Sequence, residues 1–191
     1  MSEALQELQS VVHWIAEQTE SMVLPVDRRG RLALGCLDLA IEHQAGLADL
    51  AARPLWGPVY ALLRCMIDAF VRGVWLARCA SEADLDSFEL AGLRGRSFDE
   101  LVDEVERALG HSRGILSKLA HSSWAMFSDF THTAAEPVRR RYPAAETDQA
   151  LRLATALGLL AATELADLCG HRDVALACKA RAAAAANAQQ H

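Results

Sequence analysis

A chain of 191 residues that is 52% hydrophobic is long enough to fold as one domain around a sizeable core, so neither disulfides nor a metal are needed for stability. Its formal charge of −6 argues against a general nucleic-acid binder, which usually carries a basic domain, but leaves room for a local basic patch. Five cysteines in apolar helical contexts, and a polar start without a signal-peptide pattern, indicate a reduced, cytoplasmic protein.

The first half of the chain predicts long helices that are separated by prolines. Apolar residues recur there at helical spacing, and helices are expected over residues 2–23, 27–52 and 59–79. Pro25 ends the first of these helices, and Pro54 and Pro58 form the break before the third.

The second half continues with helices whose starts carry capping residues. They are expected over residues 82–90, 98–109, 112–131, 147–168 and 171–186. Ser97 with Glu100 has the spacing of a capping box, and the stretch 133–146, with two prolines and three arginines, is expected to be a loop. This pattern predicts an all-α fold, an antiparallel bundle of about seven helices joined mostly by short connections.

The most apolar stretch of the chain, residues 153–163, is predicted to be a core helix. Arg152 and Glu164 bound it, which makes it too short to span a bilayer, so no membrane association is expected. We expect a single domain over residues 1–180. The alanine-rich end, 181–191, has high helix propensity but no anchoring side chains and is expected to fray.

The third predicted helix carries the first candidate site. Arg64, Asp68 and Arg72 are spaced four apart and form one stripe, to which Trp75 returns after eleven residues. The rest of this helix is apolar nearly all round, which is typical of a buried helix. Three interpretations are open: an exposed face with i,i+4 ion pairs, a partly buried structural ion network, or a ligand or catalytic site.

Histidines and arginines in the second half form the next candidates. Ser128 and His132 are four apart and could hydrogen-bond, although no third group of a catalytic triad is identifiable. His121 shares a helix face with His132, but about 16 Å of axial rise separates them, too far for one metal. Arg139 and Arg140 could bind phosphate or carboxylate, or form a solvated basic loop.

No cofactor or metal is predicted. Cys169, His171 and Cys178 match no zinc-ligand spacing, and no CxxC pair is present. The sequence also has no Walker loop, Rossmann fingerprint, HExxH or GxSxG motif.

The segment LLRCMIDAFVRGVWL at residues 62–76, FTHT at 130–133 and the arginines at 139 and 140 resemble a family of uncharacterised bacterial all-helical proteins. The resemblance covers roughly residues 31–178. The family has no established activity, so the resemblance implies a fold type but no reaction.

A more distant resemblance is to HEPN-type helical bundles, which include RNA-cleaving toxins and phage-defence proteins. Their mark is an Arg, four to six residues, and then a His. The closest pairs here are Arg113 with His121, separated by seven residues, and Arg107 with His111, separated by three. An active site of this type would need an arginine from a different helix.

The function predicted from the sequence is accordingly a non-enzymatic or unassigned helical bundle, expected to form a homodimer. We expect it to bind a small anionic ligand or a partner in a polar groove formed by Arg64, Asp68, Arg72, His132, Arg139, Arg140 and Glu164. Glu164 is a lone acid in an apolar helix and should need a partner such as Arg64 or Arg72. The alternative is a HEPN-like, RNA-directed nuclease.

Overall fold

The computed structural model describes residues 2–23, 27–91, 96–110, 114, 116–117, 130 and 142–187. All regular structure in these ranges is helical, which confirms the predicted all-α class. The helices are α1 (Glu3–Thr19), α2 (Arg28–Ala52), α3 (Trp56–Arg78), α4 (Glu82–Ala91), α5 (Phe98–Ala108), α8 (Ala144–Leu168) and α9 (Arg172–Asn187).

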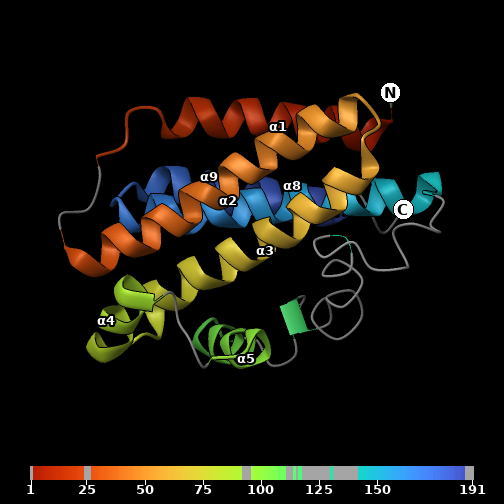
Figure 1. Cartoon of the computed structure of the whole chain (residues 1–191). Helices are drawn as coiled ribbons and strands as arrows, with labels where there is room; N and C mark the ends of the chain where they lie inside the picture. Colours follow the sequence, from red (N-terminus) through yellow and green to blue (C-terminus); the bar gives the residue numbers. More distant parts are fainter. Residues whose placement is uncertain are drawn as a thin grey trace.

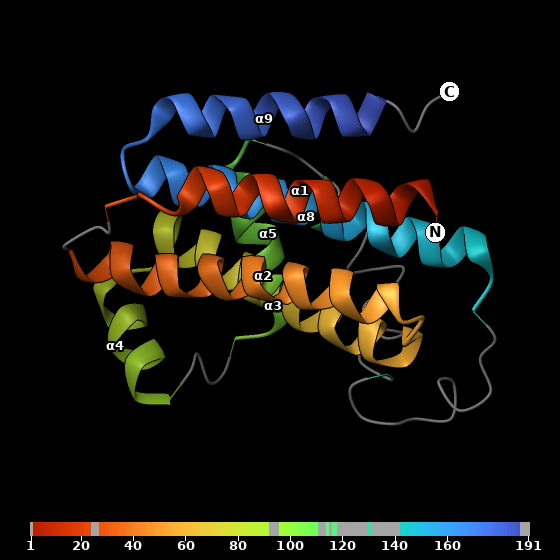
Figure 2. The ribbon, with the colours of Figure 1, turned by 90° about the horizontal axis from the view of Figure 1, so that it is seen from above.

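Helix α8 lies at the centre of the assembly. It packs against α1, α2, α3 and α9, while α2 and α3 form the most extensive helix pair and α5 packs on α3. Figures 1 and 2 show that α1, α3 and α8 run in one direction and that α2 and α9 return. The sequence of α8 explains its position, because a helix with apolar residues nearly all round must be covered on most sides.

Two glycines permit close helix contacts. At Gly73 of α3, a Cβ atom would lie 2.7 Å from Cγ of Leu37, so α2 and α3 approach closely at this level. At Gly158 of α8, a Cβ atom would overlap the side-chain amide of Gln44 from α2. Neither contact leaves room for a larger side chain without movement of its neighbour.

Side chains cap the starts of α1, α2 and α5, and the cap of α5 was predicted from the sequence. The side chains of Ser2 and Asp27 accept hydrogen bonds from the first turns of α1 and α2, and Ser97 with Glu100 forms the predicted capping box of α5. These side chains satisfy N–H groups in the first turn of each helix and need no contact with another helix to do so.

Three predicted boundaries were wrong. Helix α1 ends at Thr19, not at Val23, so it stops well before Pro25. Helix α3 begins at Trp56, not at Val59, because Pro58 lies in the first turn, where a missing N–H costs no hydrogen bond. Helix α8 begins at Ala144, directly after Pro143, so the predicted loop ends earlier than residue 146. Of the helix predicted over 112–131, residues 116, 117 and 130 are helical and Gly114 is not, and the rest lies outside the described residues.

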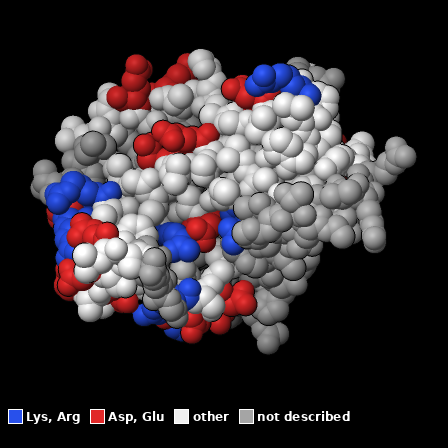
Figure 3. Space-filling model, viewed as in Figure 1, with Lys and Arg blue, Asp and Glu red and all other residues white. Residues whose placement is uncertain are grey.

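Two arginines at the start of α2 contact the end of α3 and helix α4. Arg29 donates through Nη1 to the carbonyl oxygens of Leu76 and Ala80, at 3.1 and 2.5 Å, at the end of α3. Arg28 forms ion pairs with Asp86 and Glu89 of α4. In Figure 3 basic and acidic side chains are correspondingly interspersed at the end of the molecule where α4 lies.

The C-terminal helix contacts the first helix. Arg181 lies over the ring of Trp14, 4.9 Å from its centroid, and donates to Ser10 at 3.0 Å. Helix α9 continues to Asn187, and fraying of residues 181–191 stays a prediction. All five cysteines are described, and each is a free thiol. Within the described ranges, no helix combines the length and apolarity that a membrane span requires.

Candidate functional site

The predicted stripe on α3 contains a partly buried ion pair. Nε of Arg72 lies 2.7 Å from Oδ2 of Asp68, and these side chains are 28% and 26% exposed. Arg64 is also half-buried. The pair is near Cys36 of α2, whose pKa is raised to about 11, mainly by burial, with Asp68 adding to the effect and Arg72 opposing it. The stripe is therefore intermediate between a solvated face and a closed network.

Trp75 does not belong to this polar group. It is fully buried, and its Nε1 donates to Oε2 of Glu104 on α5 at 2.6 Å. Arg96 donates to the other oxygen of Glu104 at 2.7 Å, and its guanidinium lies over the Trp75 ring, 5.1 Å from the centroid. These contacts connect α5 to α3, so Trp75 has a structural role.

Glu164 has an arginine partner, as expected for a buried acid, but the partner is neither Arg64 nor Arg72. Nε and Nη2 of Arg78 lie 2.8 and 2.7 Å from Oε2 of Glu164. Arg78 is in the last turn of α3, one turn beyond Trp75. The structure thus separates the predicted groove: Asp68 and Arg72 pair with each other, and Glu164 pairs elsewhere.

The remaining predicted site residues, His132, Arg139 and Arg140, lie outside the described residues, as do His121 and Ser128. Their relation to Arg64, Asp68 and Arg72 therefore stays a prediction. Within the described part of the chain, no group of three or more His, Cys, Asp or Glu side chains gathers as a metal site would require.

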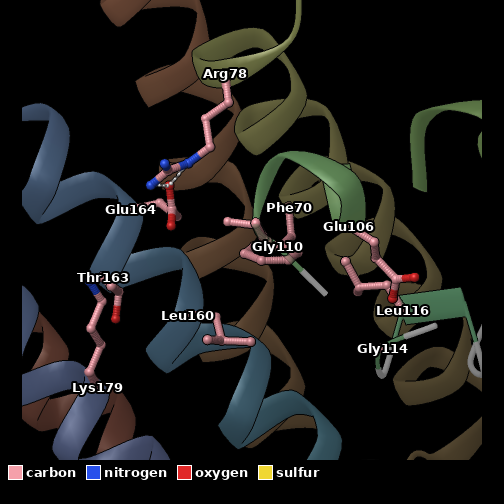
Figure 4. A pocket seen from close by; sticks show the side chains of 11 residues that line it. Phe70, Arg78, Glu106, Gly110, Gly114, Leu116, Leu160, Thr163, Glu164 and Lys179 are labelled. Atoms are coloured by element: carbon pink, nitrogen blue, oxygen red, sulfur yellow. Dashed lines mark hydrogen bonds and ion pairs between the residues drawn. The ribbon is translucent and has the colours of Figure 1, made fainter. Parts of the chain in front are cut away.

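A cavity of about 780 Å³ lies beside the Arg78–Glu164 pair. Residues from α3, α8 and α9, from the end of α5 and from the segment after it line the cavity: Phe70, Arg78, Glu106, Leu109, Gly110, Gly114, Leu116, Leu160, Thr163, Glu164 and Lys179. Figure 4 shows the ion pair at one side and the apolar side chains of Phe70 and Leu160 toward the middle. Asp68 and Arg72 are not among the lining residues.

The Glu164 carboxylate uses its two oxygens differently. Oε2 accepts both hydrogen bonds from Arg78, whereas Oε1 accepts none from any residue in the described ranges. In Figure 4 this second oxygen points away from the guanidinium, toward the side where Leu160 and Phe70 lie. Glu164 is only 9% exposed, so the structure buries a carboxylate with one open acceptor directed toward a cavity.

Glu106 also lines the cavity, but its carboxylate is occupied. It accepts a hydrogen bond at 3.0 Å from the backbone N–H of Ser117 and another from the Ser117 hydroxyl. Burial is the largest single influence on the pKa of Glu106 and raises it, yet the hydrogen bonds from Ser117, Gly114 and Leu116 together outweigh burial and lower the pKa. In Figure 4 its carboxylate is directed toward Gly114 and Leu116, away from Glu164.

Two further polar residues complete the lining. Lys179 of α9 lies 3.4 Å from Asp167 and keeps 53% of its side-chain exposure, so it stands at the solvent side. The hydroxyl of Thr163 donates to the carbonyl of Leu159 within α8 at 2.8 Å, which leaves its lone pairs as acceptors. The cavity therefore combines an apolar interior with a few polar groups, as small-molecule sites usually do.

The model of DUF6988, a family of unknown function, matches residues 37–188. The chain belongs to this family. The match confirms the resemblance to an uncharacterised family, and it includes every residue that lines the cavity. No curated protein and no solved structure matches the chain. The HEPN alternative receives no support from the DUF6988 match.

Neither Arg78 nor the cavity was predicted from the sequence. A signal for Arg78 was present, because it is fourteen positions after Arg64, which places it within about 40° of Arg64 on a helix. The cavity itself had no such signal. Its walls come from residues between Phe70 and Lys179, and which side chains face one another depends on how α3, α5, α8 and α9 pack in this DUF6988 chain.

Proposed function

We propose that this DUF6988 chain is a small-molecule-binding protein and that the ligand occupies the cavity between α3, α5, α8 and α9. The observation that carries the proposal is the buried Glu164 carboxylate, which directs an open acceptor toward an apolar cavity. Oε1 of Glu164 is reached by solvent from the cavity rather than sealed in the core, so a ligand that donates a hydrogen bond to it would replace water there.

The size and lining of the cavity support the same proposal. Its volume of about 780 Å³ falls within the range of roughly 300–1,000 Å³ that small-molecule sites occupy. Phe70, Leu109, Leu116 and Leu160 offer apolar surface to the body of a ligand. The polar groups are few and lie around these side chains, an arrangement that orients a ligand.

Binding is favoured over catalysis by the chemistry of the described lining residues. Among them, Thr163 has the single hydroxyl, and it donates to its own helix. Glu106 accepts hydrogen bonds from the segment that follows α5. The Lys179 amine, the other possible nucleophile among the described lining residues, is half-exposed and pairs with Asp167 at the solvent side.

The test fills the cavity and measures binding of small aromatic probes. Leu160 lines the cavity and is 37% exposed, so Leu160→Trp should place its larger ring there without unfolding α8. Titration of 2-naphthamide, followed by NMR, should show saturable binding to the wild type and little or none to Leu160→Trp. The matched control is Leu176→Trp on α9, where the leucine is 66% exposed and does not line the cavity. Equal binding by all three proteins would contradict the proposal.

We also propose, from the sequence, that a small anionic ligand binds at the stripe on α3. Arg64, Arg72, Arg139 and Arg140 support it as cations. Asp68 weakens it, because an anion at Arg72 must compete with a carboxylate at 2.7 Å. Titration with inorganic phosphate tests this proposal, and a response that Arg72→Met does not reduce would count against it.

We further propose, from the sequence, that the protein is bacterial and cytoplasmic and forms a homodimer. The high apolar content of a small, mildly charged bundle favours a dimer, because some helix surface is then left to be covered by a second copy. Exposed leucines such as Leu90 and Leu176, at 87% and 66%, are compatible with a covered face. Light scattering at tens of micromolar should give the mass of a dimer, and a monomer mass would count against it.

A further inference from the structure

We infer that the head group of the ligand is neutral and both donates and accepts hydrogen bonds, as a primary carboxamide or the edge of a nucleobase does. This inference rests on the proposed function, because it concerns the ligand of the same cavity. It goes further in choosing among anionic, cationic and neutral head groups. The pairing of the charged side chains in and beside the cavity favours a neutral head group.

The ion pair offers one open acceptor and open donors. Both bonds from Arg78 end on Oε2 of Glu164, through Nε and Nη2. Oε1 of Glu164 and Nη1 of Arg78 have no partner within the described ranges. A head group that binds here therefore meets an acceptor that needs an N–H or O–H and a guanidinium that can donate to a carbonyl.

Four of the five charges around this position form two ion pairs, and the Glu106 carboxylate is left as a single negative charge without a cationic partner in these pairs. Arg78 is matched by Glu164, and Lys179 is matched by Asp167 at 3.4 Å. The fifth charge, on Glu106, is directed to Ser117 and its neighbours. A charged head group would therefore lose its hydration on binding beside Arg78 and Glu164 and would find no unpaired opposite charge there.

Each charged head group meets a specific obstacle. An anion would be attracted by Arg78 but would face the Glu164 carboxylate, which is the more deeply buried partner, at 11% side-chain exposure against 38%. An ammonium group would bind Oε1 but would be repelled by Arg78, whose Nε and Nη2 lie within 3 Å of the same carboxylate. A neutral amide satisfies both partners and has a much smaller desolvation cost than an ion.

The apolar side chains of the cavity indicate what the rest of the ligand, apart from its head group, should be. Phe70 of α3, Leu109 at the end of α5 and Leu116 after it line the cavity together with Leu160 of α8. An aromatic or branched apolar body matches these walls, while the head group lies at the Arg78–Glu164 side. The ligand class is thus an apolar body with one neutral donor–acceptor group.

The experiment compares four probes that share one ring system: 2-naphthamide, 2-naphthoate, 2-naphthylmethylammonium and 2-methylnaphthalene. With the wild-type chain, we expect the amide to bind about tenfold more tightly than either ion. Tighter binding of the naphthoate or the ammonium probe than of the amide would overturn the inference, and so would equal binding of all four.

Charge-changing variants sharpen the test by predicting a switch of preference. Glu164→Gln leaves the cation of Arg78 unmatched, so the naphthoate should become the preferred ion by about tenfold. Arg78→Met leaves the carboxylate unmatched, and the ammonium probe should then be preferred. Helical circular dichroism of each variant shows that it is folded, and the wild-type ranking remains decisive if one variant is not.

The failures of the two proposals can be told apart. If the probes bind and Leu160→Trp blocks them, but the head groups do not rank as expected, the cavity stands as a binding site and the head-group inference is wrong. If none of the four probes binds the wild type, the proposed function itself is contradicted, and the inference falls with it.

Discussion

Asp68 and Arg72 form an i,i+4 ion pair that retains about a quarter of its exposure, 26% and 28% for the two side chains. Exposed pairs of this spacing contribute about 0.5 kcal/mol, whereas breaking a fully buried pair costs roughly 3–5 kcal/mol. The exposure places this pair nearer the lower limit. We therefore expect Asp68→Asn to lower the free energy of unfolding by about 1 kcal/mol, measured by urea denaturation.

The control for this prediction is the pair of His13 and Glu17 on α1, which has the same spacing but exposures of 80% and 58%. Glu17→Gln should change stability by less than about 0.5 kcal/mol. If Asp68→Asn is as harmless as this control, the stripe on α3 is in effect solvated, and a ligand proposal built on it loses its physical basis.

Glu106 predicts a pH dependence of stability. Its pKa in the folded protein is lowered from an ordinary value of 4.5, because hydrogen bonds to its carboxylate outweigh the effect of burial. A carboxylate with a lowered folded pKa contributes stability that is present above the ordinary value and is lost as the pH falls through the folded value. Glu106→Gln should therefore be less stable than the wild type at pH 7, and the difference should shrink below about pH 4.5.

Urea denaturation at several pH values measures this difference, and Asp103→Asn is the matched control. Asp103 lies on the same helix and is exposed. A difference between Glu106→Gln and wild type that stays constant from pH 7 to pH 3 would show that the lost hydrogen bonds do not depend on the charge.

At the scale of elements, the contact between α2 and α8 depends on Gly158. The Gln44 side chain is fully buried there and donates to the carbonyl oxygen of Ala154 at 3.0 Å. A Cβ at position 158 would overlap this amide. Gly158→Ala should cost about 1–3 kcal/mol through overpacking, even though alanine favours a helix by up to about 1 kcal/mol.

Gly35→Ala in α2 is the control, because a Cβ at position 35 meets nothing within 4 Å. It should leave thermal stability unchanged or raise it by up to about 1 kcal/mol. The double variant Gly158→Ala with Gln44→Ala should recover part of the loss, since the overlapping group is gone. A Gly158→Ala protein as stable as wild type would mean that α2 and α8 separate easily.

Local signals predicted the helices well, and tertiary contacts escaped them. Ser97 and Glu100 fixed the start of α5 because a capping box satisfies N–H groups within four residues. The start of α3 was predicted too late because Pro58 was interpreted as a break. A proline disrupts a helix only where its backbone N–H would donate to the preceding turn, and Pro58 lies in the first turn. The fit of Gln44 on Gly158 could not be predicted, since the two residues are 114 positions apart and nothing local links them.

The candidate site shows the same limit at the scale of the whole molecule. The sequence indicated that Glu164 needs a cation, because an isolated acid in an apolar helix is costly to bury. It could not indicate Arg78 in preference to Arg64 or Arg72, since that choice depends on how far α3 is displaced along α8. The chemistry of a site can thus be foreseen from composition and spacing, while its partners require the packed fold.

The packing around α8 leads to a prediction about the whole chain. One buried cluster joins residues of α1, α2, α3, α5 and α8, so these helices should unfold together as the single domain that the sequence predicts over residues 1–180. Trp75 on α3 belongs to this core, whereas Trp14 on α1 packs against a second, smaller cluster of residues from α1, α8 and α9. Tryptophan fluorescence and far-ultraviolet circular dichroism should therefore give the same urea midpoint, and Gly158→Ala should shift both equally. Two separate transitions would show that α1 and α9 form a unit that unfolds independently of α2 and α3.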